Sequence, residues 1–375
     1  MAEHVLKAGA SGGPLASSES RLVYVDNLRV ALTVLVVLHH SALSFMGADQ
    51  VPTGVLTVFT VINQAYFMGL FFLIAGYFVP GSMHRKGGVA FVRGRLVRLL
   101  LPLIGYVLLL SPITALDANN ATDVSGPFWR FYLDNLSVGA LWFVEVLLVL
   151  TLAYAVLAGL AGRVKRRAPR ASTARRPLPS PVGVASGVVG IALLTYLVRT
   201  VLPFGAQFLT LPTPSHLPQY VAMFVVGAAA HRCDWFSQLS RRAGRAGFVL
   251  AAVASVTLLP LALVHTPTFM GESWHWSSLV YALWESALCV GLSFGLLSLF
   301  RRRLDRQRRL GAFLSAHAFT VFVLHLPVIA CLTLFVRQLP DVPFLGFVVG
   351  GALAVTISFA LAYPLRSRTP LGRFL

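Results

Sequence analysis

The sequence predicts an all-α fold, a polytopic membrane helical bundle with about 10 transmembrane helices. Three observations lead to this fold class. Hydrophobic residues fill 57% of the 375 positions and charged residues only 12%, and the mean hydropathy is +0.75. A soluble domain usually carries about 25% charged residues. One soluble core cannot cover this much apolar surface, whereas a bilayer can.

Ten apolar runs approach or exceed the roughly 20 residues that a membrane-spanning helix needs. In chain order they are 27–46, 54–79, 97–116, 139–162, 182–203, 217–231, 246–265, 277–300, 311–336 and 343–364. The sixth run is short, so we expect it to begin within the preceding outer loop or to be tilted. We expect a disordered cytoplasmic tail at 1–20, one transmembrane domain at 21–366 and a cytoplasmic tail at 367–375.

The basic residues occur in alternate connections between these runs. Of the 31 Lys and Arg, all but Arg130, Arg199 and Arg337 lie near the termini or in every second loop. The positive-inside rule places those loops and both termini in the cytoplasm, which predicts a multi-pass protein of the cell membrane. The net charge of +18 then reflects topology and contact with anionic lipid, and we expect no nucleic-acid partner.

Several catalytic and metal-binding motifs are missing from the sequence. Cys233, Cys289 and Cys331 stand far apart and form no CxxC pair. No Walker loop or HExxH occurs, so we expect no metal and no ATP hydrolysis, and we also expect no serine triad.

The first run places several polar groups within one helix. Asp26 and Arg29 stand at its cytoplasmic mouth, and His39 and His40 lie about three turns deeper. Eleven positions separate Arg29 from His40, which puts them about 20° apart around the helix and roughly 16 Å apart along its axis. A site on one helix face therefore favours His40, although either histidine could instead be a satisfied packing residue.

Other strongly polar side chains also fall within runs, where each is a functional candidate because burial in lipid is costly. Glu145 lies at a depth similar to that of His40, and a carboxylate beside an imidazole is a common arrangement for a base. The remaining candidates are Asn63, Gln64, His216, Gln219, Tyr220, Glu285 and His325. A buried hydrogen bond between helices is the alternative for each of them. At the cytoplasmic side, Arg95 and Arg98 are one turn apart and suit phosphate, lipid phosphate included.

Six segments resemble, in order, those of the acyltransferase 3 family of integral membrane O-acyltransferases. The resemblance covers about 24–364 and is closest to the glucan biosynthesis protein C-like branch. YVDNLRVALTVLVVLHH is similar to the family's first span, with an Arg, ten residues and a His, matched by Arg29 and His40. FFLIAGYF resembles the FFxxSGF signature, with Ala75 where Ser is usual.

The later segments continue the resemblance. FVRGRLVRLLLP is similar to the family's RxxR segment at Arg95 and Arg98, and ALWFVEVLL to its Trp…Glu segment at Trp142 and Glu145. HLPQYVAMFVVGAAAHR and AFTVFVLHLPV, which contains His325, resemble later signatures. The family implies transfer of an acyl group, often acetyl or succinyl, from cytosolic acyl-CoA to a hydroxyl of a carbohydrate, lipid or antibiotic.

With the resemblance, the candidates take roles in a site without a metal. We expect His40 as catalytic base and Glu145 as its partner or as a binder of acceptor hydroxyls. The expected substrate-binding residues are Asp26, Arg29, Asn63, Arg95, Arg98, Trp142, Gln219 and His325. Direct transfer and a transient acyl-histidine both remain open, as do the roles of His39 and Glu285. The competing functions are a proton-coupled transporter or exporter of a polyol or glycan, and a structural scaffold.

Overall fold

A computed structural model describes residues 22–46, 54–115, 127–165, 176–204, 206, 214–264, 274–336 and 343–374. The expected tail at 1–20 lies outside these ranges. Within them every regular element is a helix, and nine helices or helical stretches are long and apolar enough to cross a membrane. The all-α polytopic bundle is therefore confirmed. The sixth predicted run, 217–231, forms a shorter helix, α9 (Leu217–Cys233), of 17 residues.

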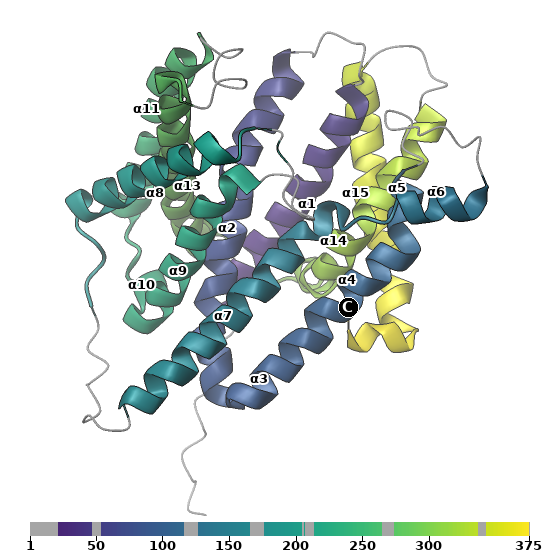
Figure 1. The fold of residues 1–375 in the computed structure, drawn as a ribbon, viewed down its shortest axis with the longest axis horizontal. Coiled ribbons are helices and arrows are strands. Elements are labelled where there is room, and N and C mark those ends of the chain that lie inside the picture. Colours follow the sequence, from purple (N-terminus) through teal and green to yellow (C-terminus); the bar gives the residue numbers. More distant parts are fainter. Residues whose placement is uncertain are drawn as a thin grey trace, which may run out of the picture.

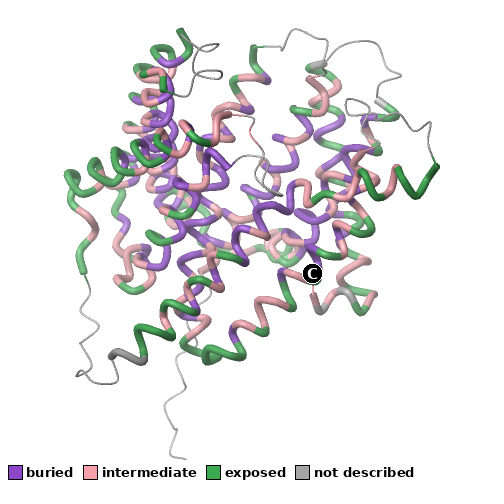
Figure 2. Tube along the Cα trace, viewed as in Figure 1, coloured by how far each residue is buried: buried purple, intermediate pink, exposed green. Residues whose placement is uncertain are grey.

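The long helices form a bundle with a buried centre and exposed flanks (Figures 1 and 2). They are α1 (Val23–Met46), α2 (Gly54–Lys86), α7 (Trp142–Lys165), α8 (Pro181–Val201), α11 (Arg241–Leu263), α13 (Trp276–Arg303), α14 (Arg309–Val336) and α15 (Pro343–Ser367). At least half of the apolar window is buried in α1, α2, α13 and α14, against 17% in α8. The four central helices therefore carry the interior, and α8 turns most of its surface outward.

The third span is a composite helix that changes its winding twice. It runs through α3 (Gly88–Arg95), the π-helix η1 (Leu96–Leu100), α4 (Leu101–Gly105), the π-helix η2 (Tyr106–Leu110) and α5 (Ser111–Thr114). Each π-helix ends shortly before a proline, Pro102 or Pro112. A proline lacks the N–H of a regular turn and crowds the carbonyl four residues earlier, and wider winding accommodates both effects. Arg98 lies within the first of these wide turns.

Short helices complete the described ranges at the ends of the bundle. They are α6 (Phe128–Asp134), η4 (Gly139–Leu141), η5 (Pro214–His216), α10 (Trp235–Gln238) and η6 (Pro370–Arg373). The η5 turn runs directly into α9, and all three of its residues are buried. Since α9 is short and η5 is buried, the chain enters this helix through residues packed inside the protein.

Helices α2 and α9 touch along their backbones at two glycines. A Cβ added to Gly76 would lie 2.1 Å from the carbonyl oxygen of Phe224, and one added to Gly227 would lie 2.1 Å from that of Leu73. No side chain fits at such distances. This contact gives a physical reason for the glycine in FFLIAGYF, because Gly76 lets α9 pack directly against α2.

Candidate active site

Three histidines from two helices gather in the middle of the bundle. The rings of His40 on α1 and His325 on α14 lie 5.0 Å apart between centroids, and those of His39 and His40 lie 5.3 Å apart. His325 is fully buried, His39 is buried and His40 is half-buried. We call these three residues the histidine cluster. It joins two runs that lie almost 300 residues apart in the chain, which the sequence alone did not pair.

Hydrogen bonds to the backbone identify Nδ1 as a protonated ring nitrogen in both His40 and His325. The Nδ1 atom of His40 lies 2.9 Å from the Val36 carbonyl oxygen, and that of His325 lies 2.7 Å from the Phe322 carbonyl oxygen. Because a carbonyl oxygen only accepts, each Nδ1 carries the proton and donates it. In the neutral ring, Nε2 then keeps its lone pair, which is the form that a general base or nucleophile needs.

The first turn of α7 lies next to the histidine cluster. Phe143 contacts Phe322 at 5.7 Å between ring centroids, and Phe322 contacts His325 at 5.6 Å. Glu145 is half-buried in this same turn. The Val36 carbonyl already accepts the His40 Nδ1 proton, so orientation of the imidazole does not require Glu145. Its two expected roles, as partner of His40 and as binder of acceptor hydroxyls, stay predictions.

Asn63 and Gln219 are buried in the N-terminal parts of α2 and α9. Asn63 is buried one turn before Phe67, whose ring lies 5.0 Å from that of His39. In the described part of the chain, the Asn63 amide nitrogen has no hydrogen-bond partner, so it has donors to offer to a ligand. Gln219 instead donates from Nε2 to the Ala65 carbonyl at 2.8 Å. Its amide therefore links α9 to α2.

A second cluster, of arginines, lies at the other end of α1. Arg95 is close enough to Arg98 and Arg29 for their positive charges to repel one another, and Arg98 repels Arg366 in the same way. We call these four residues the arginine cluster. Arg29 pairs with Asp26 at 3.7 Å and covers the ring of Phe78 at 4.6 Å. Four guanidinium groups beside this carboxylate leave an excess of positive charge that an anion would relieve.

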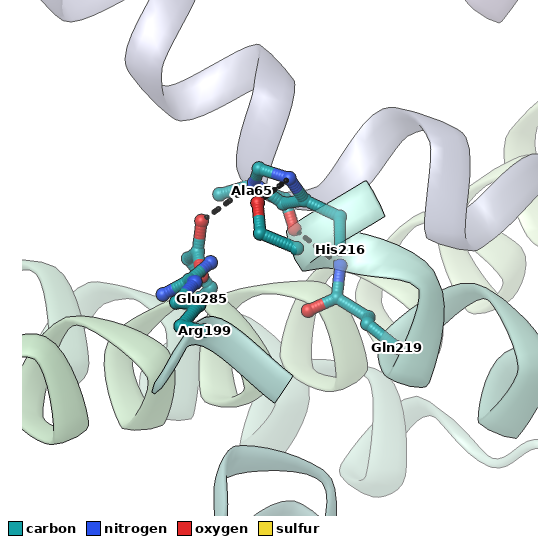
Figure 3. A network of polar contacts seen from close by, with 6 residues as sticks. Ala65, Arg199, His216, Gln219 and Glu285 are labelled. Atoms are coloured by element: carbon teal, nitrogen blue, oxygen red, sulfur yellow. Dashed lines mark hydrogen bonds and ion pairs between the residues drawn. The ribbon is translucent and has the colours of Figure 1, made fainter. Parts of the chain in front are cut away.

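A third polar group, a buried ion network, joins α8, α13 and η5 (Figure 3). Arg199 donates from Nη2 to a carboxylate oxygen of Glu285, and His216 Nε2 lies 3.1 Å from the other oxygen. Arg199 and Glu285 are 1% and 2% exposed. The guanidinium of Arg199 also lies over the rings of Phe204 and Tyr281, 4.1 and 5.6 Å from their centroids.

Aromatic rings connect the ion network to the helices around the histidine cluster. His216 stacks on Tyr220 at 6.1 Å, and Tyr220 stacks on both Phe72 and Trp142, at 5.1 and 5.4 Å. Phe72 in turn contacts Phe143, at 4.7 Å. The ion network therefore supports the wall formed by α2, α7 and α9, and it lies beyond that wall from the histidines.

The match to known families covers almost the whole chain. A family model described as an acyltransferase domain matches residues 22–363. The chain belongs to the acyltransferase 3 family. This confirms the resemblance seen in the sequence and makes the protein a membrane acyltransferase, whereas its placement in the glucan biosynthesis protein C-like branch stays a prediction. No curated protein and no solved structure matches the chain.

In this acyltransferase the predicted site residues divide between the two clusters. His40 and His325 belong to the histidine cluster, and Trp142 and Glu145 lie in or beside the wall next to it. Asp26, Arg29, Arg95 and Arg98 lie together at the arginine cluster, although they come from different spans. Asn63 lies near His39, and Gln219 is engaged with α2.

Sequence reasoning missed two residues that the structure brings into these groups. The sequence places Arg366 only among the basic residues near the C-terminus. The fold brings it from α15 to Arg98. Arg199 stood out as one of three basic residues away from the basic loops, which was the available signal. Its partner Glu285 is 86 positions away, so only the packing of α8 against α13 identifies the pair.

The described ranges contain no group of three or more His, Cys, Asp or Glu side chains arranged to hold a metal ion. The ligand best suited to the arginine cluster is an anion with several phosphate groups, because guanidinium groups bind phosphate oxygens through paired, charge-assisted hydrogen bonds.

Proposed function

We propose that this acyltransferase moves a short acyl group, acetyl or succinyl, from acyl-CoA to a hydroxyl of a carbohydrate, lipid or antibiotic acceptor. The observation that carries the proposal is the arrangement along α1. Arg29 joins the arginine cluster near one end of the helix, and eleven positions later His40 presents a basic Nε2. At about 1.5 Å per residue, roughly 16 Å separate them along the axis.

The donor would bind with its phosphates at the arginine cluster. Acyl-CoA is strongly anionic and carries its thioester at the end of a long pantetheine arm. Arg95, Arg98, Arg29 and Arg366 would hold the phosphates, and the arm would run along α1 toward His40. The positive-inside pattern of the sequence favours a cytoplasmic location for this end of the bundle, where acyl-CoA is available.

At the histidine cluster, Nε2 of His40 would remove the proton of the acceptor hydroxyl as its oxygen attacks the thioester carbonyl. Collapse of the tetrahedral intermediate forms the ester, breaks the C–S bond and releases the thiolate, which takes the proton back from His40. The Asn63 amide would donate to the oxyanion. Glu145 and Trp142 would contact the acceptor. A general base of this kind typically contributes 10²–10⁴-fold.

Binding of coenzyme A to the purified protein tests the donor half of this proposal. Isothermal titration of the wild type should give saturable binding that weakens as salt is added, and Arg95→Gln with Arg98→Gln should weaken it at least tenfold. Arg309→Gln removes an exposed arginine at the start of α14 and serves as the matched control. Equal binding by the double variant and the control would exclude the arginine cluster as the donor site.

A separate experiment distinguishes direct transfer from an acyl-histidine intermediate. Protein incubated with radiolabelled acetyl-CoA and no acceptor is denatured rapidly and tested for retained label. Label that is retained by the wild type and absent from His40→Ala supports the two-step route, and its absence from both supports direct attack.

A further inference from the structure

An apolar groove lies on the other side of α2 from the histidine cluster. It has a volume of about 170 Å³ and runs between α8 and the surfaces of α9, α10 and α13, with Leu73 of α2 at its floor. No residue of the histidine cluster, the arginine cluster or the ion network lines it. The proposed acyl transfer therefore does not use this groove.

The polar atoms in the lining are already engaged. Ser293 donates its hydroxyl to the Cys289 carbonyl at 2.7 Å, and Trp235 donates its indole N–H to the Pro177 carbonyl at 3.0 Å. The rest of the lining is aliphatic or aromatic carbon. An occupant of the groove therefore gains by burying apolar surface and finds no polar partner along its length.

The length of the groove matches one leaflet of a bilayer. Its lining on α8 extends from Gly183 to Ile191, a distance of eight residue steps or about 12 Å along the helix. Half of a hydrocarbon core is about 15 Å thick. A single acyl tail that enters from one membrane surface would fill this length.

Arginines surround the end of the groove at Trp235 and Phe236. Arg301 donates from Nη1 to the carbonyl oxygens of Phe236 and Leu239, at 3.0 and 3.4 Å. The exposed Arg232 lies two residues beyond the lining residue Ala230 and donates from one Nη2 hydrogen to the Tyr154 hydroxyl at 2.9 Å. The exposed Arg176 lies two residues before Leu178, and its carbonyl oxygen accepts from Gln238 of α10 at 3.2 Å. These three cations, which we call the groove arginines, outnumber the two nearby carboxylates, Asp234 and Asp305, which act on Tyr24 together with Arg301.

From these observations we infer that the groove binds one anionic glycerophospholipid, with an acyl tail between α8 and α13 and its phosphate at the groove arginines. Tail length and apolar lining set the position of the lipid, and the excess of positive charge favours an anionic over a zwitterionic head group. The bound lipid would fill the gap beneath α8, which is the least buried span of the bundle.

Two glycines of α8 offer a matched pair for testing the groove. Gly187 lines it and Gly190 does not, and a Cβ added at either position meets no atom within 4 Å. Gly187→Phe therefore fills the groove, while Gly190→Phe adds the same side chain to the same helix elsewhere. Val184→Trp, within the groove, and Val189→Trp, on the exposed face, form a second pair.

Native mass spectrometry of the delipidated, full-length protein in neutral detergent measures the binding directly. We expect one phosphatidylglycerol to be retained, with about tenfold preference over phosphatidylcholine that has the same tails. Gly187→Phe and Val184→Trp should lose this lipid, and Gly190→Phe and Val189→Trp should keep it. Arg232→Gln should reduce the preference at least threefold, whereas Arg309→Gln should preserve it.

Three results would overturn the inference. Equal retention of phosphatidylglycerol and phosphatidylcholine would show that the groove arginines do not select the head group. Equal loss of lipid in the groove variants and the control variants would show that the lipid binds elsewhere. Failure of the wild type to retain any lipid would contradict both the head-group contact and the groove as the binding site. Coenzyme A binding is measured separately, so failure here leaves the proposed acyl transfer unaffected.

Discussion

Removal of Glu285 should destabilise the protein far more than removal of its whole ion pair. Arg199 and Glu285 are 1% and 2% exposed, and His216 holds the second carboxylate oxygen. Glu285→Leu leaves the Arg199 guanidinium buried without its counter-ion. Breaking a buried pair in this way typically costs about 3–5 kcal/mol.

The double variant Arg199→Met with Glu285→Leu removes both charges. Apolar replacement of a complete buried pair is often close to neutral. His216 still loses its carboxylate acceptor, which costs about 1–3 kcal/mol. We therefore expect the double variant to be more stable than Glu285→Leu alone, although it has lost one more native side chain.

Unfolding in mixed detergent micelles with increasing sodium dodecyl sulfate, followed by tryptophan fluorescence, measures both free energies. Glu285→Leu should unfold at clearly lower denaturant, and adding Arg199→Met should recover part of the loss. A single variant within 1 kcal/mol of the wild type, or a double variant less stable than the single one, would show that the two charges do not depend on each other.

Two further predictions concern helix packing and the donor site. Gly76→Val should prevent folding, because its Cβ would lie 2.1 Å from the Phe224 carbonyl oxygen, whereas Ala75→Ser should fold normally. Size-exclusion chromatography of the two purified variants compares them. A monodisperse Gly76→Val protein would contradict the close contact. Arg366→Gln should weaken coenzyme A binding about twofold to tenfold, since it removes one of four clustered charges. The neighbouring Arg368→Gln should leave binding unchanged. Equal affinities of the two variants for coenzyme A in titration would exclude Arg366 from the donor site.

Much of the fold follows from local properties of the sequence. Ten apolar runs predict the spans because each helix must satisfy its own backbone within the bilayer, and even the short α9 is visible as a run of reduced length. The two π-helices of the third span are different. Prolines mark where regular winding fails, but the sequence does not say whether a kink, a break or a wider turn results.

The candidate site also has one part that the sequence predicts and another that only the tertiary structure shows. Arg29 and His40 share one helix, so their spacing predicts their separation without any knowledge of tertiary structure. The contact of His40 with His325 depends on the packing of α1 against α14, and the approach of Arg366 to Arg98 depends on where α15 ends. Such contacts depend on the whole arrangement of helices, and no local pattern encodes them.

The hydrogen bonds of His40 also required the structure. A carboxylate at similar depth made Glu145 the natural partner for the imidazole. The structure adds the Val36 carbonyl from the neighbouring turn of α1, which holds Nδ1 of the ring without a second helix. The sequence contained this possibility, since every helical residue has a carbonyl four positions earlier, but nothing in it distinguished the two partners.

Acyl transfer by the His40→Ala variant tests the central claim most directly. Membrane vesicles containing the wild type or the variant at equal, folded amounts receive radiolabelled acetyl-CoA, and label in extracted lipid and glycan is counted. We predict that His40→Ala lowers the rate of labelling at least 10²-fold and still binds coenzyme A with wild-type affinity. Labelling at the wild-type rate by the variant would contradict the assignment of His40 as the base.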